Sequence, residues 1–82
     1  MHISEQADSV HDMKSLVQFM NALRRDFTSN KDEWENRSID AYLESIAAWI
    51  EDYSKVDNPD VDLKNPDWRS IAAIFYMGKI YE

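Results

Sequence analysis

Carboxylates are the side chains of this sequence that could do chemistry, because the other reactive types are scarce. The chain has no cysteine and two histidines, His2 and His11. Two imidazoles nine residues apart do not share a helical face, as the i, i+4 ligands of a helical zinc site do. The lack of cysteine excludes disulfides, thiolate metal sites and thiol nucleophiles. We therefore expect no metal and no catalytic histidine.

Three aspartates lie close together at Asp57, Asp60 and Asp62. An EF-hand loop that begins at Asp60 would need glycine and glutamate where the sequence has Asn65 and Ile71. The chain has one glycine, whereas a phosphate-binding loop needs several. We interpret these aspartates as solvated and expect no cofactor.

A second set of acids, Asp40, Glu44 and Glu51, falls on one helical face at spacings of four and seven. Glycoside hydrolysis needs two carboxylates that flank a cleft, one with a pKa raised by burial. These three acids instead lie opposite the apolar stripe of their helix, so we expect no enzyme. Two interpretations remain open: a solvated face, or a surface that binds a partner.

Hydrophobic spacing predicts three helices that would position these acids. The first covers about 9–29, with Ser9 as its N-cap, and the second covers 38–54, with Ser38 as its N-cap. The third covers 66–81, after the start signal Asn65-Pro66. Residues 54–65 are left as a longer loop.

These elements predict an all-α, compact three-helix domain. One glycine and two prolines are too few for a turn-rich β fold, and 44% hydrophobic residues argue against disorder. We expect residues 1–8 to be a flexible lead-in and residues 9–82 to form a single domain.

The third helix is apolar on all sides from residue 71 to residue 77. Such a helix is enclosed by its neighbours, or part of it faces a second protein. In the second case Tyr76 and Met77 would form a homodimer face. Gly78 fits either case, because a missing side chain allows close approach of another element.

The net charge of −7 comes from the middle of the chain. Residues 32–67 hold eleven acids and three bases, whereas residues 1–31 hold four of each. This negative field repels nucleic acids and anionic membranes and allows a basic partner. The N-terminus does not resemble a signal peptide, and cysteine is absent, so we expect a cytoplasmic protein.

Trp34 stands out because acids surround it in the connector before the second helix. It either plugs the end of the bundle or anchors an interface with a cationic partner. Trp49 and Trp68 lie next to apolar stripes and are expected in the core.

Four blocks occur in order: WEN at 34–36, DAYLESIAAWIEDY at 40–53, NPDW at 65–68 and KIYE at 79–82. They resemble a family of small uncharacterised bacterial proteins of unknown function, which read WEN, YLExxAAWIxD, NPxW and KIYE. The resemblance runs from about Ser9 to the last residue and implies a fold rather than an activity. In size and charge such proteins are similar to the immunity proteins that neutralise bacterial toxins.

The resulting hypothesis is a non-catalytic protein–protein interaction domain, of immunity or antitoxin type, that binds a basic, toxin-like protein through its acidic surface. The alternative is a structural or regulatory subunit that homodimerises through Tyr76 and Met77. The residues expected to bind the partner are Trp34, Asp40, Glu44, Glu51 and Asp52.

Overall fold

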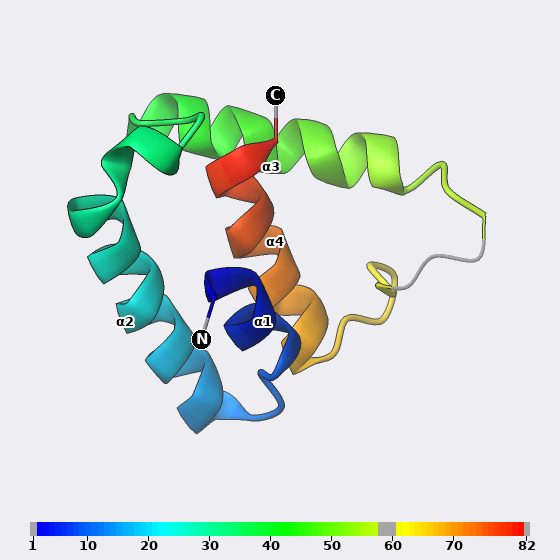
Figure 1. Cartoon of the computed structure of the whole chain (residues 1–82). Helices are drawn as coiled ribbons and strands as arrows, with labels where there is room; N and C mark the ends of the chain where they lie inside the picture. The colour runs from blue at the N-terminus through cyan, green and yellow to red at the C-terminus, as the bar shows by residue number, and fades with distance from the viewer. Residues whose placement is uncertain (1, 58–60, 82) are drawn as a thin grey trace.

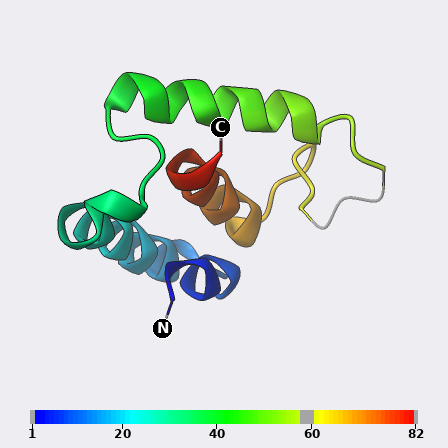
Figure 2. The same ribbon diagram turned by 45° about the horizontal axis from the view of Figure 1, so that its top comes forward.

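The helices pack around one of their number. The computed structural model describes residues 2–57 and 61–81. The C-terminal helix lies between the long helix that precedes it and the two N-terminal helices (Figures 1 and 2). The described residues form helices and no strands, which confirms the all-helical class and adds a short fourth helix. The elements are α1 (Ile3–Asp8), α2 (Met13–Ser29), the short 3-10 helix η1 (Lys31–Glu33), α3 (Ile39–Tyr53) and α4 (Trp68–Ile80).

Helix α4 is the central element, because it packs against α1, α2 and α3. Ala72 is fully buried, and the neighbouring Phe75 and Tyr76 pack against the same core. The apolar run of this helix is therefore used mainly inside the domain. Of the two interpretations of that run, enclosure by neighbouring helices describes the packing.

The N-terminal segment differs most from the expectation. A flexible lead-in does not describe residues 3–8, which form α1 and pack on α4 and α2. Ile3, Ala7 and Val10 are all buried. Ile3 and Ala7 lie one turn apart on one side of α1, Val10 follows the end of the helix, and all three belong to the core. Polar residues between them hide this pattern in so short a stretch.

Helix α2 begins later than predicted because its N-cap is Asp12. The Asp12 Oδ1 atom accepts a hydrogen bond from the Ser15 backbone N at 2.8 Å. In return, the Asp12 backbone N donates to Ser15 Oγ at 3.1 Å, which completes a capping box. Ser9, the predicted N-cap, instead ends α1.

The same chemistry sets the start of α4. Asp67 Oδ1 accepts from the Ser70 backbone N at 2.8 Å, so the helix begins after Asp67 and not at Asn65-Pro66. At α3 the prediction is confirmed, since Ser38 Oγ accepts from the Ala41 backbone N at 3.1 Å.

The core joins α1, α2 and α4 around Phe19, which is fully buried. Trp49 is buried, as expected. Trp68 is not a core residue, because it is the first residue of α4 and is 37% exposed.

Candidate functional site

A groove of about 550 Å³ lies between α2 and α3. It stays open because α3 packs on α4 and, within the described residues, makes no close backbone approach to α2. The buried side chains of Leu23 and Trp34 line its bottom, together with Phe75. The more exposed Met20 and Ile39 line its edges. The groove is therefore largely apolar.

Rows of exposed apolar side chains extend from this groove along both helices. Met13, Val17 and Met20 are 68%, 54% and 37% exposed, and their spacings place them on one side of α2. Ile39 and Leu43 are 72% and 56% exposed and lie one turn apart on α3. Spacing alone predicted these residues on the buried faces. Both helices thus have wider apolar faces than the domain covers.

Among the described residues, the charged side chains that line the groove are those of Arg24 and Arg37, and no described acid lines it. Arg24 donates to Asn21 Oδ1 at 3.2 Å, and Arg37 Nε donates to the Trp34 carbonyl at 3.2 Å. Neither arginine forms an ion pair with a described residue. The groove therefore carries uncompensated positive charge in a chain whose net charge is −7.

Trp34, the first of the sequence-predicted site residues, is buried at the end of the bundle. Its Nε1 donates to Asp26 Oδ2 at 2.8 Å. Its ring meets Phe27 edge-on, with centroids 5.0 Å apart, and stacks on Tyr42 at 6.0 Å. Trp34 therefore closes the end of the bundle, as the first of its two interpretations predicted. Its indole also lines the groove.

The predicted acids do not gather at one place. Asp40, Glu44 and Glu51 are exposed on the outer side of α3, with no ion pair among the described residues; we call them the acidic row. Asp52 lies on another side of the helix and accepts a hydrogen bond from the Tyr81 hydroxyl. That hydrogen bond, with burial and the charge of Asp52, raises the pKa of Tyr81.

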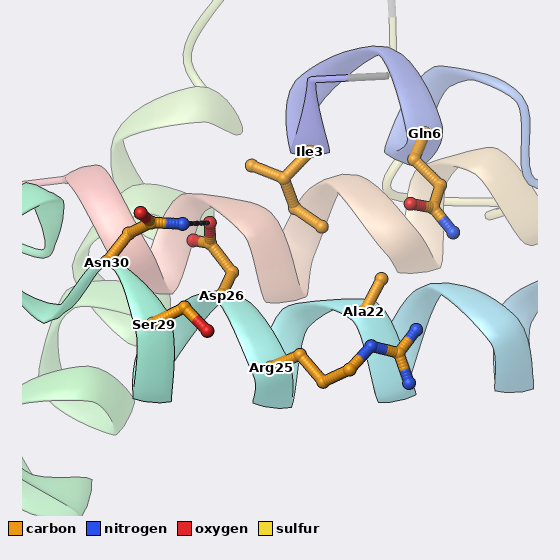
Figure 3. A pocket seen from close by; sticks show the side chains of 7 residues that line it. All are labelled: Ile3, Gln6, Ala22, Arg25, Asp26, Ser29 and Asn30. Atoms are coloured by element: carbon orange, nitrogen blue, oxygen red, sulfur yellow. Dashed lines mark hydrogen bonds between the residues drawn. The ribbon is translucent and has the colours of Figure 1, made fainter.

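Sequence reasoning missed a buried ion pair between Asp26 and Lys79. The Lys79 Nζ donates to Asp26 Oδ2 at 2.7 Å, and the two side chains are 5% and 13% exposed. Asn30 Nδ2 donates to Asp26 Oδ1 at 3.0 Å. Figure 3 shows this bond at a recess of about 220 Å³, with Ile3 of α1 opposite. The Asp26 carboxylate at this recess is therefore bonded to residues of its own chain.

The environment of Asp26 keeps it ionised. Burial opposes the charged form, but hydrogen bonds from Lys79, Trp34 and Asn30 outweigh it, and the pKa of Asp26 is lowered. A signal for this role was present in the sequence. Asp26 continues the buried series Phe19 and Leu23 at helical spacing, so it falls on the inner face of α2.

The sequence blocks WEN and KIYE meet in the structure. The Glu35 backbone N donates to the Lys79 carbonyl at 3.0 Å. Asn36 Nδ2 donates to the carbonyls of Gly78 and Tyr81, at 3.0 and 2.8 Å. The Tyr42 ring packs so closely on Gly78 that a Cβ there would lie 2.7 Å from ring carbons. These contacts bind the connector to the end of α4, so the two blocks have structural roles.

The loop acids that the structure describes form no further site. Asp60 lies outside the described residues. Asp62 Oδ1 accepts from the backbone N of Lys64 and Asn65, at 3.0 and 3.2 Å, and so closes a turn. Residues 2–57 and 61–81 contain no group of three or more histidines, cysteines or acids placed to hold a metal ion. In the same ranges, no helix has the length and hydropathy needed to cross a membrane.

Three carboxylates with lowered pKa values predict that acid destabilises the fold. Hydrogen bonds from Ser15 and Ser70 lower the pKa of Asp12 and Asp67 below 3.8, as the contacts described above do for Asp26. Such groups stabilise the fold above their unfolded pKa, and the contribution is lost as pH falls through the folded value. Thermal melts should give a nearly constant melting temperature from about pH 7 to about pH 5 and a steep fall below about pH 4. An unchanged melting temperature at about pH 2 would contradict this expectation.

Comparison with known proteins identifies the family of the chain. The model of a family described as a family of unknown function (DUF7660) matches residues 12–82. No curated protein and no solved structure matches the chain. The match confirms that the chain resembles a family of unknown function, and it begins after α1.

Proposed function

The chain belongs to the DUF7660 family of unknown function, and we propose that it is a non-catalytic protein-binding domain. The observation that carries the proposal is the apolar groove between α2 and α3, with exposed apolar rows on both of its walls. A surface of this kind on a small domain is typical of an interaction site.

The energetics favour a protein as the occupant. Covering one exposed aliphatic side chain is worth about 1.5–3 kcal/mol. Val17, Met20, Ile39 and Leu43 stand along the groove or extend its walls, so a segment of a partner chain could cover several of them together. The buried aromatic residues at the bottom of the groove would add contact area.

The acidic row supports a second candidate, the binding of a basic, toxin-like protein by an immunity-type protein. Asp40, Glu44 and Glu51 are exposed and form no ion pair with a described residue. Their charge is free to steer a cationic partner and could raise its association rate by about 10- to 1000-fold. This candidate uses the outer side of α3 and leaves the groove unexplained.

Homodimerisation through α4 has less support. Tyr76 packs against the core, and both Tyr76 and Met77 are half-buried because α4 lies between the other helices. The groove offers more exposed apolar surface for association than these two residues do.

Affinity capture from the native cell distinguishes the two surfaces. The groove variant combines Met20→Glu with Ile39→Glu, and the acidic-row variant is Glu51→Lys. All three residues are exposed, so both variants should fold, and circular dichroism checks this. We expect the groove variant to lose the captured protein and the acidic-row variant to retain it.

The reverse pattern would favour the immunity-type candidate. Capture that is unchanged in both variants, compared with the unmodified chain, would overturn the proposal that the groove binds a protein.

A further inference from the structure

Helix α3 itself carries the chemistry that fits the groove. Ile39 and Leu43 are exposed on one side of it. Asp40 and Glu44 each follow one of these residues in the sequence, so they lie about 100° further round the helix. The exposed part of α3 is therefore an apolar row with acids along one border.

The groove has the complementary properties. Its lining is mainly apolar, its charged residues are Arg24 and Arg37, and neither arginine is ion-paired with a described residue. A helix that places apolar side chains in the groove would bury them there. Carboxylates of the same helix at the edge of the groove would neutralise the two arginines. Helix α3 of another copy of the chain has this pattern.

We propose that the groove binds α3 of a second copy, and that the two copies bind each other reciprocally as a twofold dimer. This inference rests on the proposed protein-binding function and names its partner. Ile39 and Tyr42 belong to α3 and also line the groove, so this helix is both a wall and an insert. A surface that is complementary to itself in this way closes in a symmetric pair.

The arrangement assigns a role to two members of the acidic row, Asp40 and Glu44. With the two α3 helices side by side and antiparallel, Leu43 of each copy lies near the twofold axis. Asp40 and Glu44 then approach the arginines of the other copy's groove. The groove of an identical chain is then the basic partner that the acidic middle of the chain predicts.

The net charge limits the strength of the dimer. Two chains of −7 repel each other at long range, and this repulsion opposes the local complementarity. We expect a dissociation constant on the order of tens of micromolar, since the buried surface and the local contacts must outweigh the translational and rotational freedom lost on association. Added salt screens the repulsion and the local ion pairs alike, so moderate salt should change the constant little.

Sedimentation equilibrium of the whole chain, from about 10 µM to about 1 mM, tests the proposal at concentrations that bracket the expected constant. We expect a reversible monomer–dimer equilibrium. Leu43→Glu should raise the dissociation constant about tenfold or more, because it places an acid in the apolar contact. Val56→Glu is the matched control, since Val56 is 47% exposed and does not line the groove.

A charge exchange tests the predicted pairing. Arg24→Glu should weaken the dimer about tenfold, whereas Arg25→Glu, on the adjacent residue that does not line the groove, should leave it unchanged. Combining Arg24→Glu with Glu44→Arg should restore most of the lost affinity. Circular dichroism of each variant separates loss of the dimer from loss of the fold.

A monomer at every concentration, or a dimer that Leu43→Glu does not weaken, would overturn the proposal. Failure of the charge exchange to restore binding would overturn the ion pairing on which the choice of partner rests. If the chain is monomeric but the groove variant loses a captured protein, the second-copy proposal fails while the protein-binding function stands.

Discussion

Replacing Asp26 with alanine is expected to lower the free energy of unfolding by about 3–5 kcal/mol. The Lys79 side chain is 5% exposed, and the change leaves its ammonium group without a carboxylate partner. It also removes the acceptor of the Trp34 indole N–H. A chain of 82 residues has a total stability of roughly 4–12 kcal/mol, at about 0.05–0.15 kcal/mol per residue. The variant should therefore lose a large share of the stability of the domain. Urea denaturation followed by circular dichroism measures the effect.

A double-mutant cycle isolates the ion pair. Lys79→Met should cost less than Asp26→Ala, because Asp26 keeps its hydrogen bonds from Trp34 and Asn30. Combining Asp26→Ala with Lys79→Met removes the unpaired buried charge and should recover part of the loss. Strictly additive losses in the double variant would show that the pair contributes nothing beyond its two side chains.

Deleting residues 1–10 is expected to cost more than about 4 kcal/mol, as the loss of two well-packed aliphatic side chains would. The deletion uncovers core that Ile3, Ala7 and Val10 bury. The single change Ile3→Ala should cost about 2–5 kcal/mol. Thermal and urea unfolding of the two variants, beside the unmodified chain, give both values.

Glu5→Gln provides the control for α1, because Glu5 is exposed on the same short helix. It should change the stability by less than about 0.5 kcal/mol. A deletion of residues 1–10 as stable as the whole chain would show that α1 contributes nothing to the core, and the assignment of this helix to the domain would be wrong.

Helices α2 and α3 could be predicted because each carries a long apolar pattern with a period near 3.6. Helix α4 could be predicted because a start signal precedes its apolar run. The first residues of α2 and α4 could not, because several polar residues near each of these starts are able to cap. Asp12, and not Ser9, is the N-cap of α2 because it forms reciprocal hydrogen bonds with Ser15. Helix α1 was missed because six residues hold too little of the pattern to be recognised.

The position of the site was harder to predict than the helices. An apolar stripe indicates that a helix has a partner but not how much of the stripe that partner covers. In α3 the stripe was expected to be buried from Ile39 to Tyr53, whereas the structure buries Ser45 and Trp49 and exposes Ile39 and Leu43. The difference depends on how α3 crosses α4, a tertiary property that spacing does not encode.

The polar residues show a similar division. Asp40, Glu44 and Glu51 were correctly placed on the outer side of α3, since charge alternates with the apolar pattern there. Trp34 was open to two interpretations until its bond to Asp26 showed it inside the bundle. Lys79 was not considered as a core residue, because its partner lies 53 positions away in the chain.

Photo-crosslinking in the native cell shows directly whether the groove binds a protein. A photoreactive residue at position 39, on the edge of the groove, should form a covalent adduct with a second protein chain. The same residue at position 51, on the outer side of α3, should form little or none. Adducts from position 51 with none from position 39 would contradict protein binding in the groove.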